Sequence, residues 1–250
     1  MIKLSYDYSG HENLENVSKM FRFNRLMYQE ILLPVLKGDY ILEVGSGIGT
    51  FSEKIIRGQP HSHIMLTDVS LYYIKQLEER FYNNNNNNND NISICKLDLN
   101  CKADYDKIGY EKFDCIIAIN VLEHVENDEF ALQQLYKMLR KEGILVLLVP
   151  CHKFLYNIID INLGHFRRYT KEELKSKVKK SQFTINSMFY FNTLGIIGWY
   201  INGSLAKNPK INATASKIFD KIIPLLMHGE RIIGKRITGL SIVCYLKKQS

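Results

Sequence analysis

The chain has 250 residues, of which 46% are hydrophobic and 24% are charged. This apolar content suffices for the packed core of one sizeable domain and excludes a chain that is disordered throughout. The net charge of +7 is uneven, because residues 1–150 carry 16 basic and 21 acidic side chains whereas residues 151–250 carry 17 and 5. The basic part predicts an acidic partner: a nucleic acid, an anionic membrane surface or an anionic substrate.

Cysteine usage and hydropathy indicate the compartment. The five cysteines form no C-x-x-C pair and are odd in number, which is typical of a reduced protein rather than of a disulfide scaffold. The first residues lack the apolar run of a signal peptide, and no segment reaches the roughly 18 apolar residues that cross a bilayer. We therefore expect a cytoplasmic protein without a transmembrane segment.

The first 150 residues alternate between helical and extended patterns. A helix is predicted over 15–33, where apolar residues recur at helical spacing before Pro34. The strands that follow are apolar on both faces and alternate with helices, which predicts a parallel sheet covered on both sides. Strands are predicted over 40–44, 64–66, 92–97, 114–119 and 143–149, and helices over 51–56, 71–81 and 129–139.

The pattern changes after residue 150. Thr170-Lys-Glu-Glu173 is the capping-box signature of a helix that runs to about residue 180. Two more strands are predicted over 183–191 and 239–246, which makes seven, with a largely helical insertion between them. The asparagine run at 83–89 predicts an exposed loop, because asparagine favours turns and solvation.

The most informative segment is Ile41-Leu-Glu-Val-Gly-Ser-Gly-Ile-Gly49, at the turn from the first strand into the next helix. Glycines at such a turn let the backbone approach a bound cofactor and expose amide groups at a helix N-terminus. A dinucleotide fingerprint requires G-x-G-x-x-G, but Thr50 occupies the third glycine position. The spacing here is G-x-G-x-G, preceded by Glu43.

This arrangement resembles the first motif of the class I S-adenosylmethionine-dependent methyltransferases, which is an acidic residue followed by G-x-G-x-G. The resemblance implies that Asp68, at the end of the second strand, binds the ribose hydroxyls of S-adenosylmethionine. It implies likewise that Asp98 accepts a hydrogen bond from the adenine amino group and that Asn120 faces the methionine end. The implied cofactor-binding residues are Glu43, Gly45, Ser46, Gly47, Gly49, Asp68, Val69, Asp98, Leu99 and Asn120.

The implied fold is a doubly wound, Rossmann-like α/β sheet of seven strands. Residues 1–37 form a helical N-terminal element and residues 38–150 the S-adenosylmethionine-binding core. Residues 151–250 form the acceptor-side part, with a lid insertion at about 192–238 and the final strand. The runs Arg22–Tyr28 and Gly164–Thr170 extend the resemblance to a subgroup of uncharacterised small-molecule methyltransferases.

The acceptor side offers several candidate residues downstream of strand ends. Methyl transfer is an in-line displacement, so the enzyme mainly positions the acceptor, and an oxygen acceptor usually needs a base. Each candidate also has a structural interpretation as a packed or hydrogen-bonded side chain. The candidate bases are His124, His165 and Tyr169, and the candidate substrate contacts are His152, Arg167, Arg168 and Trp199.

No metal site is predicted, because His61 and His63 have no third ligand nearby in sequence. The insertion combines an apolar cluster around Trp199 with flanking lysines, which is typical either of a lid over an amphiphilic, lipid-linked anionic acceptor or of a plain helical subdomain. The expected activity is methylation, at oxygen, of a small-molecule or lipid-linked acceptor. Peripheral contact with a membrane is left open, and nucleic acid is disfavoured as a partner. The alternatives are an NAD(P)-dependent oxidoreductase and a non-catalytic methyltransferase-like binding protein.

Overall fold

The computed structural model describes residues 11–82, 91–211, 213–232 and 237–249, and only the backbone within 226–232. The loop expected at 83–89 therefore lies outside the described residues. Among the described residues no helix combines the length and the apolar character that crossing a bilayer requires.

One seven-stranded sheet organises the chain, in the order β3-β2-β1-β4-β5-β7-β6. Strands β1 to β5 pair in parallel, whereas β7 runs antiparallel to both β5 and β6. The predicted seven strands and doubly wound α/β class are confirmed. The strands are β1 Tyr40–Val44, β2 His63–Asp68, β3 Ile92–Lys96, β4 Phe113–Ile119, β5 Leu139–Pro150, β6 Thr184–Phe191 and β7 Ser241–Lys247.

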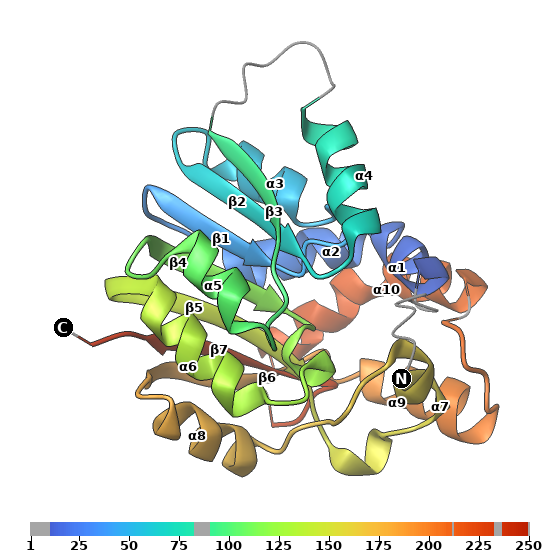
Figure 1. Cartoon of the computed structure of the whole chain (residues 1–250). Coiled ribbons are helices and arrows are strands. Elements are labelled where there is room, and N and C mark those ends of the chain that lie inside the picture. The colour runs from blue at the N-terminus through green and yellow to red at the C-terminus, as the bar shows by residue number, and fades with distance from the viewer. Residues whose placement is uncertain (1–10, 83–90, 212, 233–236, 250) are drawn as a thin grey trace, which may run out of the picture.

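Helices cover both faces of this sheet (Figure 1). On one face α5 (Lys102–Ile108), α6 (Asp128–Met138) and α8 (Lys171–Lys180) bury their apolar stripes. The other face is covered by helices that include α3 (Ser52–Gly58) and α4 (Leu71–Phe81). The buried residues of α4 recur every three or four positions, as an amphipathic helix requires.

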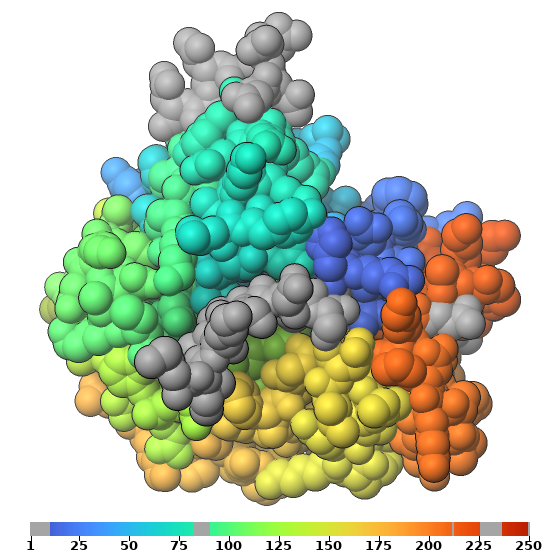
Figure 2. All heavy atoms as spheres, turned by 45° about the vertical axis from the view of Figure 1, so that its right-hand side comes forward, coloured from blue at the N-terminus to red at the C-terminus, as the bar shows by residue number. Residues whose placement is uncertain are grey.

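The N-terminal segment is two helices rather than the single one predicted over 15–33. The first, α1 (His11–Ser18), ends where Met20 leaves helical geometry, and α2 (Phe21–Met27) follows and continues as η1 (Tyr28–Leu32). The break lets α2 pack on the sheet while α1 reaches the edge formed by the carboxyl ends of the parallel strands. On the surface α1 lies between α4 and the C-terminal insertion (Figure 2).

The remaining helices gather around the same edge of the sheet (Figure 1). The Asn157 amide, which caps α7, donates to the carbonyl of Trp199 at 3.4 Å and to the hydroxyl of Ser204 at 3.2 Å, and so ties α7 to the insertion. These elements are η2 Leu122–His124, η3 Lys153–Leu155, α7 Ile158–Leu163, α9 Gly195–Trp199, η4 Tyr200–Leu205 and α10 Ala213–Ile232.

Candidate functional site

The glycine loop between β1 and α3 adopts a backbone that only glycine accommodates easily. Gly45, Gly47 and Gly49 have φ angles of +70°, +53° and +80°. A Cβ on Gly45 would lie 2.5 Å from a methyl group of Val121, so this position is closed to larger residues by sterics as well as by conformation. Above the loop, the Leu14 side chain of α1 lies 3.7 Å from where a Cβ on Gly47 would be.

Two acidic residues flank this loop. The Asp68 carboxylate, at the end of β2, accepts hydrogen bonds of 2.9 Å from the amides of Gly47 and Ser70. The Glu43 carboxylate is buried in β1 and accepts a hydrogen bond from the Ser52 hydroxyl. Burial raises the pKa of Glu43 to about 7, and burial likewise raises the pKa of Asp68. Two buried carboxylates beside a glycine turn suit a ligand that brings hydroxyl and ammonium donors.

The other expected cofactor residues follow neighbouring strands. Asp98 is half-buried after β3, and buried Leu99 follows it. Asn120 follows β4, is exposed and has a φ of +52°. Val69, directly after Asp68, is 39% exposed. Because β3, β2, β1 and β4 are adjacent and parallel, these residues line one edge of the sheet, where ligands of α/β proteins bind.

A cavity of about 340 Å³ opens beside Asn120. It lies between the sheet, the N-terminal helices and the C-terminal insertion, so its walls come from segments about 200 residues apart in sequence. Its polar residues include His124, His165 and Arg168. Its mainly apolar wall includes Leu14, Val17, Met20, Phe23, Phe191, Trp199 and Phe219.

A buried polar network centred on Asp160 supports one wall of this cavity. The Asp160 carboxylate accepts hydrogen bonds of 2.8 Å from His165 Nδ1 and from Arg168 Nε, and of 3.3 Å from the Trp199 indole. The guanidinium of Arg168 also lies 4.6 Å from the Trp199 ring centroid. Burial opposes ionisation of Asp160, but the hydrogen bonds from His165 and Arg168 outweigh it and hold the pKa of Asp160 below its usual range.

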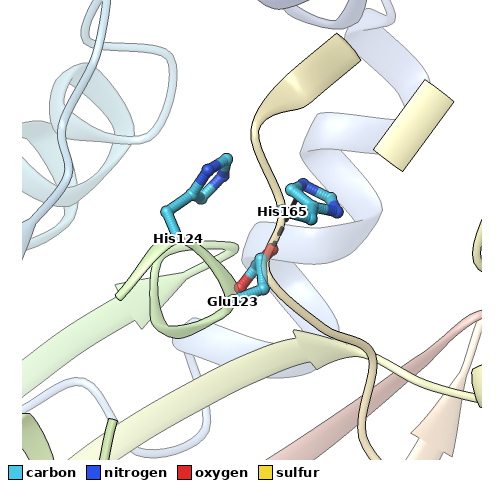
Figure 3. Close-up of side chains that lie close together, drawn as sticks. All are labelled: Glu123, His124 and His165. Carbon is cyan, nitrogen blue, oxygen red and sulfur yellow. Dashed lines mark ion pairs between the residues drawn. The ribbon is translucent and has the colours of Figure 1, made fainter. Parts of the chain in front are cut away.

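Glu123 and His124, from η2 after β4, lie close to His165 (Figure 3). The two histidines line the cavity, and Glu123 is fully buried beside them. The His124 and His165 rings pack edge to face with centroids 4.6 Å apart. Burial raises the pKa of Glu123 to about 7. Burial and the proximity of His165 lower the pKa of His124 to about 3, so its imidazole is neutral at physiological pH.

Three of the expected acceptor residues, Tyr169, Arg167 and His152, have structural partners outside the cavity, whereas Arg168 lines it. Tyr169 is fully buried and its hydroxyl donates to the Asp128 carboxylate at 2.9 Å, so its position is wrong for a base. Arg167 pairs with the same carboxylate at 2.9 Å. His152 bonds the Thr238 hydroxyl at 2.9 Å and stacks on an aromatic ring of β6. Arg168 is also a buried network residue, with its guanidinium turned to Asp160.

Two site residues were absent from the sequence prediction. Glu123 directly precedes the candidate base His124, and a carboxylate next to a candidate base is the sequence feature that could have indicated it. Asp160 is a lone acid within the apolar run of α7, where it forms a capping box with Asn157. An ionisable residue within an apolar run predicts a buried pair, but its partners lie up to 39 residues away and become visible only in the folded chain.

Comparisons with known proteins agree with this geometry. Residues 42–145 match a family model described as a methyltransferase domain. A reducing polyketide synthase, Preu2 of Preussia isomera, is 30% identical over 109 residues, which are 43% of this chain and 4% of that protein. Probable polyketide synthase 10 of Dictyostelium discoideum is 28% identical over 123 residues, or 44% of this chain and 5% of that protein. The chain thus matches only a small part of these curated relatives.

Solved structures share the fold at low identity. A S-adenosylmethionine-dependent methyltransferase from Archaeoglobus fulgidus superposes with a TM-score of 0.60 at 17% identity, covering 98% of this chain and all of that one. The CurJ carbon methyltransferase gives a TM-score of 0.57 at 16% identity, covering 93% of this chain and 54% of that one.

The family match within residues 42–145 shows that this part of the chain carries a methyltransferase domain, whose cofactor is S-adenosylmethionine. The fold is that of solved S-adenosylmethionine-dependent methyltransferases. The expected enzyme class and cofactor are confirmed, and the alternative of a nicotinamide-dependent oxidoreductase is not supported. The glycine turn and the carboxylates of Glu43 and Asp68 fit this cofactor.

Proposed function

We propose that this domain transfers the methyl group of S-adenosylmethionine to a hydroxyl oxygen of a small-molecule or lipid-linked acceptor held in the cavity. The observation that carries the proposal is the cavity itself, which borders the expected cofactor site at Asn120 and is lined by His124 and His165, with buried Glu123 beside them. Its apolar wall suits the carbon skeleton of an acceptor, and its polar end suits the reacting oxygen.

The cofactor edge supplies binding and orientation. Asp68 and Asp98 hold the nucleoside, and Glu43 and the glycine loop hold the methionine portion against the sheet. The sulfonium supplies an electrophilic methyl group, so the chain's main task is to hold the acceptor oxygen in line with it and to exclude water. The apolar wall supplies that exclusion.

The acceptor hydroxyl must lose a proton as the oxygen–carbon bond forms. Two of the three expected bases, His124 and His165, line the cavity, and of these His165 is hydrogen-bonded through Nδ1 to the Asp160 carboxylate at 2.8 Å. This pairing fixes the orientation of the His165 ring and leaves Nε2 as the nitrogen that would accept the proton. The low pKa of His124 makes it a weak base, and Tyr169 lies outside the cavity.

Calorimetry with S-adenosylhomocysteine tests the cofactor half of the proposal. We expect binding to the wild type and loss of at least ten-fold in affinity for Asp68→Ala. Asp106→Ala is a matched control, because that carboxylate is exposed and pairs with Lys102 on the helix surface. Absence of binding to the wild type would refute the assignment. Binding without transfer of labelled methyl to any fraction of a cell extract would favour the non-catalytic alternative.

The outer face of α10 supports the lipid-linked form of the acceptor. Ile218, Ile222 and Leu225 follow one another at helical spacing and are 58%, 45% and 74% exposed. Lys217 and Lys221 are exposed on the same helix. An apolar stripe flanked by lysines is typical of a helix that lies on an anionic membrane. We expect the protein to sediment with phosphatidylglycerol vesicles and the Ile222→Asp variant to sediment less. Equal amounts of protein sedimenting with neutral vesicles would contradict binding to an anionic membrane.

Methylation at carbon is a second candidate, supported by the relatives rather than by the cavity. The curated relatives named above are polyketide synthases, and one structural neighbour is described as a carbon methyltransferase. A carbon acceptor next to a carbonyl group also requires a base. The product distinguishes the two candidates, because fragmentation or NMR of the labelled product locates the methyl group on oxygen or on carbon.

A further inference from the structure

We propose that Glu123, His124 and His165 bind a divalent transition-metal ion at the polar end of the cavity and that this ion holds the acceptor oxygen. The inference deepens the proposed function and rests on it for the acceptor's chemistry. The metal site itself rests on the geometry of three side chains.

The three residues form a ligand set of suitable type and spacing. Each offers one ligand atom, and these atoms all lie within 4.8 Å of one another. Glu123 Oε1 and His165 Nε2 are 3.9 Å apart. Two imidazoles and one carboxylate suit divalent zinc, manganese, iron or cobalt. Bonds of about 2.0–2.2 Å place such ligand atoms roughly 3–3.5 Å apart, so small inward side-chain rotations close the site.

The charge arrangement favours a cation at this position. Glu123 is fully buried, and neither of its carboxylate oxygens has a hydrogen-bond partner among the described residues. A buried unpartnered carboxylate is costly. His165 Nδ1 is hydrogen-bonded to the Asp160 carboxylate at 2.8 Å, while His165 Nε2 and Glu123 Oε1 lie 3.9 Å apart. A cation between these two atoms gives the buried Glu123 carboxylate the partner that it lacks.

Both histidines also have the outer partners that metal-bound histidines usually have. His165 has the Asp160 carboxylate at 2.8 Å on its Nδ1, and Arg168 holds that carboxylate in place. His124 has a hydrogen bond to the backbone of Gly164. Carboxylates and backbone carbonyls in this position fix the orientation of the ring and increase its basicity toward a metal.

The open coordination positions face the acceptor, since His124 and His165 both line the cavity. Three protein ligands leave room for two oxygens of one acceptor, such as vicinal hydroxyls or a hydroxyl beside a carbonyl. The ion lowers the pKa of the bound hydroxyl, whose proton passes to water. The oxygen then forms its bond to the methyl carbon as the carbon–sulfur bond breaks, and the electron pair of that bond stays on sulfur. In this form the ion replaces His165 as the group that activates the oxygen.

Metal binding is measured directly, without an acceptor. The full chain is stripped with chelator, dialysed and titrated with Mn²⁺ and Zn²⁺ by calorimetry, with elemental analysis of the dialysed complex and Co²⁺ absorption as a report on coordination. Glu123→Gln and His165→Ala test the site. His61→Ala is the control for binding to an exposed histidine outside the cluster. S-adenosylhomocysteine binding of every variant, in chelator, shows that the fold is retained.

We expect one ion per chain, an affinity at least ten-fold weaker in both site variants and no change in His61→Ala. Less than a tenth of an equivalent in the wild type, or equal affinity in Glu123→Gln and the wild type, would overturn the metal site. S-adenosylhomocysteine binding is measured without metal, so the two proposals are tested independently. A protein that binds S-adenosylhomocysteine but no metal ion contradicts only the metal site, and one that does not bind S-adenosylhomocysteine contradicts the cofactor site.

Discussion

Asp160 is the residue whose removal should disturb the acceptor side most. Its carboxylate is fully buried and accepts hydrogen bonds from His165, Arg168 and Trp199 as well as from the backbone N–H of Asn157 at the start of α7. Arg168 is only 2% exposed, and replacement of Asp160 by alanine leaves its buried guanidinium without the carboxylate that it pairs with. The remaining partners of Arg168 are the Cys151 carbonyl at 3.1 Å and the Trp199 ring.

The expected magnitude follows from this burial. Removing one member of a buried ion pair costs about 3–5 kcal/mol, because an uncompensated charge stays in the interior. For a chain of this length that corresponds to a fall of roughly 10 °C in Tm. Asp160→Asn keeps an acceptor oxygen for His165 or Arg168 and should lose clearly less than Asp160→Ala.

Urea denaturation followed by circular dichroism, in the presence of chelator, measures the effect. Glu79→Ala is the matched control, because Glu79 is an exposed acid on α4 whose ion pair with Lys75 spans 4.0 Å. Its unfolding midpoint should remain within error of the wild type. An unfolding free energy of Asp160→Ala within about 1 kcal/mol of the wild type would refute the reasoning, since surface pairs contribute no more than that.

Three further predictions concern the cofactor edge. Glu43 binds its proton more tightly in the folded chain, where its pKa is about 7, than in the unfolded chain, where it is 4.5. Protonated Glu43 therefore stabilises the fold below the unfolded pKa, and this stabilisation is lost as pH rises through about 7. Apo stability should fall by up to about 3 kcal/mol between pH 5 and 8, and Glu43→Gln should flatten this slope in urea titrations. Gly45→Ala should lower Tm and abolish S-adenosylhomocysteine binding, because the new methyl group meets Val121; unchanged calorimetry would contradict the loop geometry. Asp68→Asn should weaken S-adenosylhomocysteine binding ten-fold or more. If NADH stabilised the wild type in thermal-shift assays as much as S-adenosylhomocysteine does, and lost this effect equally in Asp68→Asn, the site would not be selective for the expected cofactor.

Much of the fold follows from local sequence pattern. Parallel strands buried on both faces are continuous apolar runs, so β1 and β4 were predicted to within one residue at either end. The α4 helix was predicted at Leu71–Phe81, because its apolar spacing is regular and it begins and ends cleanly. The break at Met20 was missed, since the apolar spacing continues across it and only packing against different parts of the molecule separates the two helices.

The placement of the expected cofactor residues at one edge of the sheet was predictable because they follow successive strands. Glu43, the glycine loop, Asp68 and Asp98 each have a fixed place at the end of a strand, and adjacent parallel strands bring those ends together. The acceptor side has no such rule. Tyr169 and Arg167 have the right chemistry and lie in the right segment, yet both are turned to Asp128.

The sequence by itself determined the methyltransferase domain, since the succession of strands along the chain, the glycine spacing and the strand-end carboxylates are all local properties. Only the tertiary structure decided which residues line the cavity that we propose as the acceptor site. Glu123 and His165 are separated by 42 positions, and the cavity walls come from both ends of the chain. Their meeting depends on how α7 and the insertion pack over the sheet, and that packing also turned a sequence prediction of no metal site into a testable proposal for one.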